Sequence, residues 1–202
     1  MKPAQLIAGA AGAAVALQAV MHAVRGQANL LRPPGAQGEG DFMARCVKCG
    51  KCMQACPYRA LKPAGANEGA SVGTPFVDPR AQACRLCEDF PCIEVCPTGA
   101  LRDVAARKDV RMGVAVIDEE ACIAFQGMRC EVCYRACPLI DEAISIDYRM
   151  REGDAIHSVF APVIDEEACV GCGLCVQRCV VGDPAVPIRI ACDAERARER
   201  AG

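Results

Sequence analysis

The spacing of the cysteines limits the possible folds of this chain more than any other feature of its 202 residues. Sixteen of the seventeen cysteines fall into four groups of four. The groups are Cys46, Cys49, Cys52 and Cys56; Cys84, Cys87, Cys92 and Cys96; Cys122, Cys130, Cys133 and Cys137; and Cys169, Cys172, Cys175 and Cys179. The first group has the C-x2-C-x2-C-x3-C-P spacing whose thiolates hold 4Fe-4S clusters in bacterial ferredoxins. We therefore predict that all sixteen cysteines are cluster ligands and that the chain binds four 4Fe-4S clusters.

The second and third groups depart from this spacing. Four residues separate Cys87 from Cys92, and seven separate Cys122 from Cys130. Such loops still close, because the entropy cost of closure grows only logarithmically with length. In the fourth group a valine replaces the proline that follows the last cysteine of the other three. We expect these changes to alter which backbone N–H groups reach the sulfurs, and such hydrogen bonds tune the reduction potential.

Two other uses of a cysteine-rich sequence fit less well. Zinc ribbons separate their two cysteine pairs by a dozen or more residues, whereas residues 46–56 hold four cysteines followed by proline. Secreted disulfide scaffolds have a similar cysteine content, but repeated groups at metal-ligand spacing argue against them. A zinc-stabilised interaction module remains a remote alternative.

Short apolar segments between the cysteine groups predict an α+β fold. They pair as residues 60–62 with 75–78, 100–101 with 114–118, and 143–147 with 161–165, and each pair is typical of a hairpin. The near-identical segments 117–122 and 164–169 indicate an internal repeat. We expect tandem bacterial-ferredoxin-like units, with short hairpins and helices wrapped around the clusters. Cluster ligation then supplies much of the folding free energy.

Residues outside the cysteine groups predict the domain organisation. Residues 1–28, mostly uncharged, indicate an export signal cleaved after Ala28, with an uncut membrane anchor or an alanine-rich helix as alternatives. Proline and glycine over residues 29–40 indicate a linker, and residues 41–192 form the predicted four-cluster domain. Residues 193–202 are a charged C-terminal tail. We expect Cys192, outside every group, to be a small buried side chain on the last strand.

Composition and motifs narrow the function. A formal net charge of −2 does not favour nucleic-acid binding, and the sequence has no glycine-rich phosphate loop, Ser-His-Asp pattern or flavin fingerprint. No catalytic residue is predicted. Several basic residues near the predicted ligands could balance cluster charge or contact an acidic partner, although we expect most of them to be ordinary solvated side chains. They are Arg45, Lys48, Lys51, Arg85, Arg129, Arg135 and Arg178. Four one-electron centres without another cofactor predict electron transfer.

Several segments resemble one family over residues 30–190. They are residues 31–36, 84–92, 96–100, 111–116 and 125–134, and the unusual spacing of the third cysteine group is the most specific element. Together they resemble the NapG/MauM ferredoxin-type family. The resemblance implies four 4Fe-4S clusters, a membrane-bound quinol-oxidising iron-sulfur partner (NapH-like), and a downstream cytochrome or reductase.

The same resemblance implies a location and leaves several systems open. It implies a periplasmic protein, exported or anchored at the outer face of the cytoplasmic membrane. Family members typically carry a twin-arginine signal, whereas residues 1–28 have no Arg-Arg pair, so the true start lies upstream or the protein stays anchored or inside. The periplasmic nitrate reductase system is favoured. The MauM branch of methylamine utilisation and the four-cluster subunits of molybdenum oxidoreductases are the alternatives.

The sequence allows two ways of pairing the cysteine groups into two-cluster units. In two-cluster ferredoxins the fourth cysteine of each motif ligates the other cluster. Residues 97–122 look like the connecting hairpin of such a ferredoxin, which favours a nested arrangement of group 2 with group 3 and group 1 with group 4. Cys179 then completes the site of Cys46, Cys49 and Cys52, and Cys137 completes that of the second group. Adjacent pairing is the alternative, because similar hairpins join groups 1 and 2 and groups 3 and 4.

Overall fold

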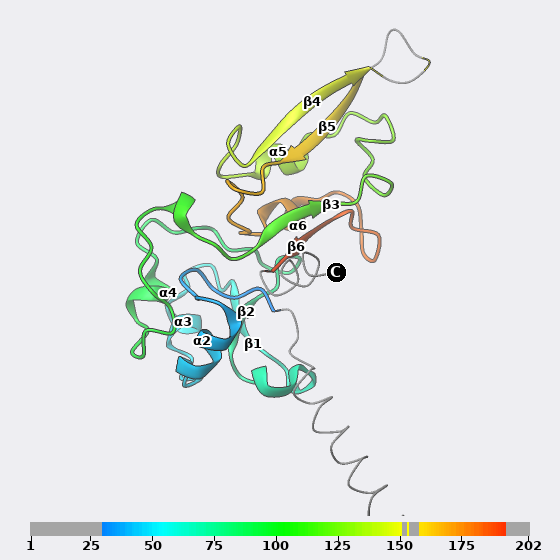
Figure 1. Cartoon of the computed structure of the whole chain (residues 1–202). Helices are drawn as coiled ribbons and strands as arrows, with labels where there is room; N and C mark the ends of the chain where they lie inside the picture. Colours follow the sequence, from blue (N-terminus) through cyan, green and yellow to red (C-terminus); the bar gives the residue numbers. More distant parts are fainter. Residues whose placement is uncertain (1–29, 151–152, 154–157, 193–202) are drawn as a thin grey trace, which may run out of the picture.

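A computed structural model describes residues 30–150, 153 and 158–192 of the chain. Predictions for residues 1–28 and for the tail over 193–202 therefore lie outside the described residues. Two units follow one another along the chain, residues 30–113 and residues 114–192, and the second stands above the first in Figure 1. Short helices and two-stranded sheets make up both units, which confirms the predicted α+β class.

The first unit contains one hairpin surrounded by short helices. Its elements are α2 (Glu39–Arg45), α3 (Lys51–Ala55), β1 (Leu61–Pro63), η1 (Ala66–Ser71), β2 (Pro75–Val77), α4 (Pro91–Glu94) and η2 (Arg107–Asp109). The strands β1 and β2 are antiparallel, with Leu61 opposite Val77. This is the hairpin predicted between the first two cysteine groups.

The second unit contains two antiparallel strand pairs. Its elements are β3 (Val114–Ile117), α5 (Val132–Ala136), β4 (Ile144–Met150), β5 (Ser158–Ile164), α6 (Leu174–Arg178) and β6 (Ile188–Ala191). The pair β4–β5 starts with Ile144 opposite Ile164 and projects away from the first unit (Figure 1). This pair confirms the hairpin predicted between the last two cysteine groups.

The hairpin predicted between the second and third cysteine groups, residues 100–101 with 114–118, is wrong. Strand β3 pairs with β6, and Val114 lies opposite Ala191. Leu101 instead forms an isolated bridge with Ala36. Each unit closes on itself through its own first and last segments, so the chain between Leu101 and Val114 joins two units and does not form a hairpin.

The stretch expected as a linker packs against the first unit where the structure describes it. Leu31 and Arg32 are buried, and Leu31 forms an antiparallel bridge with Val77. The N–H of Arg102 donates to the carbonyl of Gly35 at 2.9 Å. Gly35 has φ +81°, and a Cβ there would lie 2.3 Å from the Arg102 carbonyl oxygen. Only glycine permits this close approach of the two segments.

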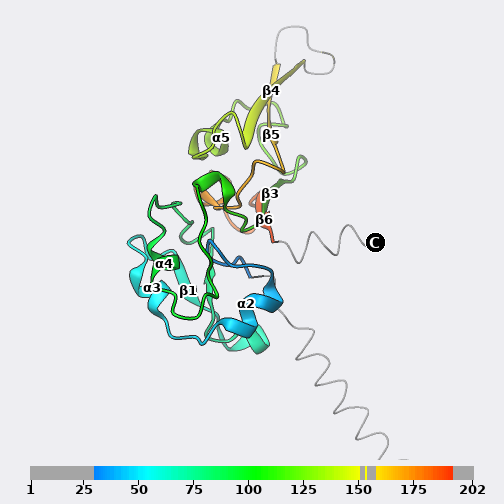
Figure 2. The ribbon, with the colours of Figure 1, turned by 60° about the vertical axis from the view of Figure 1, so that its left-hand side comes forward.

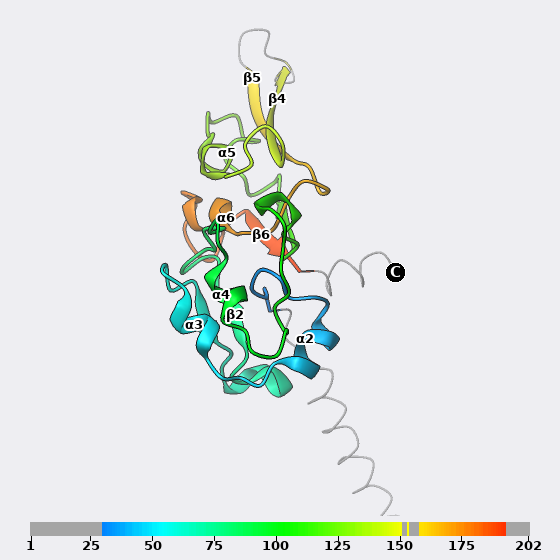
Figure 3. The same cartoon turned by 90° about the vertical axis from the view of Figure 1, so that its left-hand side faces the viewer.

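Side chains and loops of both units meet at one junction. The Cys84 N–H donates to the Cys172 carbonyl at 3.0 Å, and the Met112 N–H donates to the Val170 carbonyl at 3.2 Å. Val170 and Cys172 of the second unit belong to the buried core of the first. The units remain stacked in the rotated views of Figures 2 and 3. Among the described residues no helix is long and apolar enough to cross a membrane.

Candidate iron-sulfur sites

Short helices fix the directions of the cysteines. In three groups the third cysteine lies inside a five-residue helix and the fourth is its C-cap residue; the helices are α3, α5 and α6. Two of these helices follow a glycine in the left-handed region, Gly50 with φ 75° and Gly173 with φ 83°. One helical turn thus separates the third cysteine from the fourth. The fourth cysteine therefore lies outside the loop that holds the first three.

Site 1 brings Cys46, Cys49 and Cys52 together with Cys96. These four side chains line one cavity, together with Phe42 and other residues. Burial raises the pKa of the Cys52 thiol to about 11, and the other three thiols contribute as neighbouring charges. The last cysteine of the second group therefore lies with the first three cysteines of the first group.

Site 2 is the reciprocal arrangement. Cys84, Cys87 and Cys92 line a second cavity together with Cys56, the last cysteine of the first group. Burial raises the pKa of the Cys84 and Cys92 thiols to about 12. The charge of Cys56 contributes to both shifts. Groups 1 and 2 therefore exchange their fourth cysteines.

Site 3 repeats this arrangement in the second unit. Cys169, Cys172 and Cys175 line a cavity together with Cys137, the last cysteine of the third group. Burial raises the pKa of the Cys172 thiol to about 12, with Cys137 as the largest charged contributor. Burial also raises the pKa of Cys175 well above its usual value.

Site 4 gathers Cys122, Cys130, Cys133 and Cys179. Burial raises the pKa of the Cys122 thiol, and Cys130 and Cys179 act on it as neighbouring charges. Burial raises the pKa of Cys133 to about 11, with Cys122 and Cys130 as neighbours. The long loop of the third group and the proline-free end of the fourth group thus meet at one site.

The nested pairing expected from the sequence is wrong. Cys96, and not Cys179, lies with the first three cysteines of group 1. Cys56, and not Cys137, lies with the first three of group 2. The cause is the strand pairing, because the hairpins β1–β2 and β4–β5 fold group 1 onto group 2 and group 3 onto group 4. The segment between groups 2 and 3 forms no hairpin that could bring those two together.

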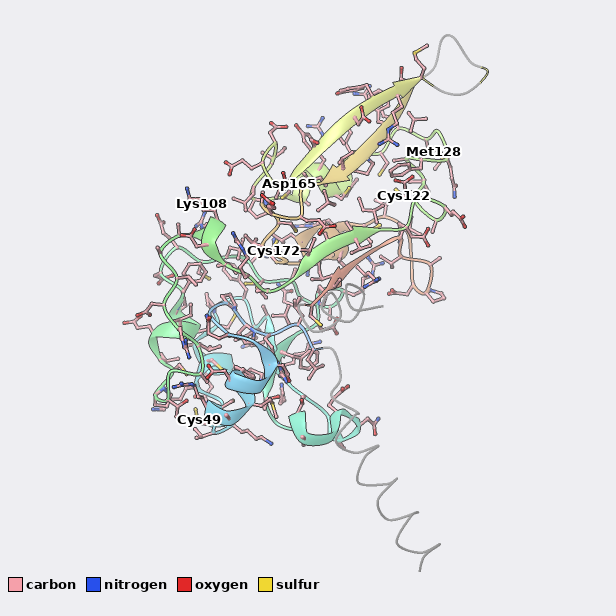
Figure 4. The ribbon with its side chains drawn as sticks, viewed as in Figure 1. Cys49, Lys108, Cys122, Met128, Asp165 and Cys172 are labelled. Atoms are coloured by element: carbon pink, nitrogen blue, oxygen red, sulfur yellow. The ribbon has the colours of Figure 1, made fainter. Side chains whose placement is uncertain are left out.

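The four sites form one row in numerical order. Cys92 of site 2 has Cys52 of site 1 among its charged neighbours. Sites 2 and 3 meet where the Cys84 N–H donates to the Cys172 carbonyl, at 3.0 Å. Cys175 of site 3 has Cys133 of site 4 as a neighbour. In Figure 4, Cys49 lies toward one end, Cys172 lies in the middle and Cys122 lies in the upper unit.

The donor sets fit 4Fe-4S clusters. Each site offers four sulfurs, and backbone N–H groups donate to sulfur from Ala60 to Cys56 at 3.3 Å and from Ala115 to Cys169 at 3.4 Å. Burial would raise the pKa of Cys96, but hydrogen bonds from the N–H groups of Leu101, Thr98 and Ala100 and from the Thr98 side chain outweigh that effect and lower it. Such hydrogen bonds stabilise the thiolate form that iron requires.

The cavities between the thiols also fit a cluster. At sites 1 to 3 the four cysteines line a common cavity. A four-iron cluster takes its thiolates at separated corners, which this arrangement provides.

Two arginines that support the sites were missed in the sequence. Arg80 of the first unit donates to the carbonyls of Val176, Cys179 and Val181, each at 3.1 Å, and so joins the end of α6 to the other unit. Arg32 is buried, bonds Glu39 and lies 4.8 Å from the Phe42 ring centroid. A structural arginine differs from a surface arginine only in the buried acceptors that surround it. The sequence shows no such acceptors, so the role of these two arginines could not be predicted.

Comparisons with known proteins agree with this division into two units. The family described as 4Fe-4S dicluster domain matches residues 45–100 and residues 126–182. The first match contains both cysteine groups of the first unit, and the second contains every grouped cysteine of the second unit except Cys122.

Ferredoxin-type proteins are similar to almost the whole chain. The chain is 46% identical over 182 residues to the ferredoxin-type protein NapG of Escherichia coli, covering 89% of this chain and 79% of that protein. It is 42% identical over 171 residues to the methylamine utilization ferredoxin-type protein MauM of Methylorubrum extorquens, covering 84% and 76%. MauM of Paracoccus denitrificans is 44% identical over 163 residues, covering 80% of this chain and 71% of that protein.

Proposed function

The chain belongs to the NapG/MauM family of ferredoxin-type 4Fe-4S electron-transfer proteins, and on that premise we propose that it relays electrons from a membrane quinol-oxidising iron-sulfur partner toward a periplasmic reductase. When bound, each cluster supplies a one-electron redox centre. We propose all sixteen grouped cysteines as the ligands, distributed over the four sites as the structure brings them together. No catalytic residue of the chain itself is part of this proposal.

The observation that carries the proposal is the row of four sites through both units. Neighbouring sites share short stretches of backbone, such as α3 between site 1 and site 2. The contact between Cys84 and Cys172 connects the units directly. Both of these cysteines are buried, so the middle of the row is shielded from water. Electron transfer requires neighbouring sites to lie close together through both units, whereas storage of clusters does not.

We propose that the residues around the sites hold the clusters in position and shield them from water. Arg80 holds the second unit against the first, and the core residues Leu86 and Val170 lie in the same buried cluster at the junction. Backbone N–H groups that donate to the cysteine sulfurs stabilise the charge of a reduced centre. The fold thus fixes the spacing between sites during transfer.

Nitrate reduction is the system that we propose first. Its support is the 46% identity with NapG over 89% of the chain. The MauM branch is the second candidate, because MauM of Paracoccus denitrificans is 44% identical over 80% of the chain. We propose a periplasmic location for either system. The export signal or anchor expected over residues 1–28 remains a prediction, which N-terminal sequencing of the mature protein can check.

Deletion of the gene followed by complementation tests the proposal. We expect the deletion to slow quinol-dependent nitrate reduction, the intact chain to restore it, and Cys49→Ser not to restore it. Cys192→Ser is the matched control, because this buried cysteine lies outside the four sites. A defect in methylamine oxidation alone would favour the second candidate. Unchanged use of both substrates would rule out the proposed function.

A further inference from the structure

The rim of site 1 is exposed to solvent and basic. Val47, Lys48, Cys49 and Lys51 are all exposed, and Val47 keeps 63% of its surface accessible. All four also line the cavity of site 1. We call these four residues the basic rim. By contrast, three cysteines of site 3 are buried.

The charge of the basic rim is not neutralised by nearby carboxylates. Residues 42–67 contain five Lys or Arg and no Asp or Glu. Within the described part of the chain, Arg45 pairs with Asp41 and Lys62 pairs with Asp78, but neither Lys48 nor Lys51 forms an ion pair. Lys48 Nζ donates only to the Ala70 carbonyl, at 3.3 Å. Both lysines therefore keep a full charge available to a partner.

The first unit is much less acidic than the second. Residues 30–113 carry 12 Lys or Arg and 9 Asp or Glu, a formal charge of +3 before clusters are counted. Residues 114–192 carry 6 Lys or Arg and 13 Asp or Glu, a formal charge of −7. Such asymmetry orients a charged partner during its approach and raises the association rate. Two clusters in each unit lower both charges equally, so the difference of ten charges remains and an acidic partner is repelled less by the first unit than by the second.

We propose that the basic rim docks an acidic one-electron redox protein, and that electrons enter or leave the row at Cys49. This inference rests on the proposed electron-transfer function and adds the place and the kind of partner. Tunnelling falls steeply with distance, so the exposed site 1 is a better exchange point than a buried one. Val47 supplies the apolar contact and the two lysines supply the charge. In one transfer a reduced cluster loses one electron and the partner gains it, with no bond made or broken.

Binding of a defined acidic probe tests the basic rim. The probe is the soluble domain of cytochrome b5, an acidic haem protein, and basic horse cytochrome c serves as the opposite probe. The full-length protein with its clusters is immobilised, and the dissociation constant of each cytochrome is measured by surface plasmon resonance at several salt concentrations. Transfer of electrons from the reduced protein to each cytochrome is followed in parallel by stopped flow.

The variants place the same change of charge either on the basic rim or at a lysine far from it. Lys51→Glu and Lys48→Glu/Lys51→Glu reverse the charge of the basic rim. Lys108→Glu is the control, because Lys108 is also an exposed lysine and lies well away from Cys49 (Figure 4). Every variant is first shown to hold the same iron and sulfide as the parent protein, so a lost cluster cannot imitate lost docking.

We expect the double variant to bind cytochrome b5 about tenfold or more weakly at low salt, and we expect high salt to remove this difference. Lys108→Glu should weaken binding less than Lys51→Glu does. Binding of cytochrome c should not weaken in any of these variants. Equal losses for Lys51→Glu and Lys108→Glu would overturn the proposal, because only net charge would then matter. So would unchanged binding in the double variant. If the reduced protein passes electrons to neither cytochrome, the proposed function itself fails.

Discussion

The two units place their cysteines in the same way, but they close their folds differently. The second unit pairs its first and last strands over four residues each, from Val114 opposite Ala191 to Ile117 opposite Ile188. The first unit has only isolated bridges at the equivalent place, such as Ala36 with Leu101. The loops and one-turn helices that hold the cysteines are thus present in both units. The sheet that pairs the first and last strands of the second unit is replaced by isolated bridges in the first.

The hairpins of the two units differ as well. Strands β1 and β2 have three residues each, whereas β4 and β5 have seven each. The longer hairpin exposes Tyr148 and Met150, at 66% and 65% of their surface. The first unit compensates for its smaller sheet with a buried polar network around Arg32. The second unit therefore relies more on backbone pairing, and the first relies more on side chains.

The largest expected effect concerns the exchange of cysteines within each unit. Loss of one site removes about four of about sixteen iron atoms. If Cys49 and Cys96 share site 1, then Cys49→Ser/Cys96→Ser loses about four irons, like either single variant. Cys49→Ser/Cys179→Ser, which strikes both units, loses about eight. Iron and acid-labile sulfide after anaerobic reconstitution measure the difference.

The reverse result would restore the nested arrangement. In that case the pair Cys49 and Cys179 would behave as one site, and the pair Cys49 and Cys96 would behave as two. Cys192→Ser is the control for a general effect of cysteine removal, and it should keep the full iron content.

Removal of Arg32 should destabilise the first unit strongly. Arg32→Leu leaves the Glu39 carboxylate without its arginine partner and removes the hydrogen bonds to Thr74 and Ser71, which costs about 3 kcal/mol of stability. The guanidinium concentration at which the visible cluster absorbance is lost measures the effect. Arg102→Leu breaks an exposed pair with Asp41 and is the control, and we expect its midpoint to stay close to that of the parent protein because solvent screens the pair. Similar midpoints for the two variants would contradict the structural role of the network.

Removal of Arg80 should loosen the junction between the units. Arg80→Ala removes three hydrogen bonds to carbonyls at the end of α6, and we expect a cost of about 2 kcal/mol because the side chain is partly exposed. The clusters of the two units should then be lost in two separate steps during denaturation. Lys62→Ala, which breaks a pair within the first unit, should keep the steps together. A single step in Arg80→Ala would show that other contacts couple the units.

The smallest expected effect distinguishes the two hairpins. Phe160 in β5 lies 5.1 Å from the Tyr148 ring in an edge-to-face arrangement, and Arg129 lies 4.8 Å over its face. Phe160→Leu should therefore cost about 1 kcal/mol beyond the lost area. Phe76→Leu in β2 is the matched control, because Phe76 makes no ring contact within the described residues. Equal costs in denaturation would mean that the ring contacts add nothing.

Part of the fold could be predicted because its signals are local. The two hairpins that join neighbouring cysteine groups were visible as pairs of apolar segments. The pairing of β3 with β6 was not, because their partners are separated by most of the second unit. Residues 29–40 looked like a linker from their prolines and glycines, but burial of Leu31 and Arg32 depends on contacts with Val77 and Thr74.

The sequence by itself determined the number of cysteine groups, the cluster type that they suit and the repeat of the unit. These follow from spacing, since a few residues between thiols decide what a loop can hold. Only the tertiary structure decided that Cys96 joins site 1, that Cys84 meets Cys172, and that Cys49 remains exposed. Each of these depends on segments brought together by strand pairing, and spacing along the chain does not encode which strands pair.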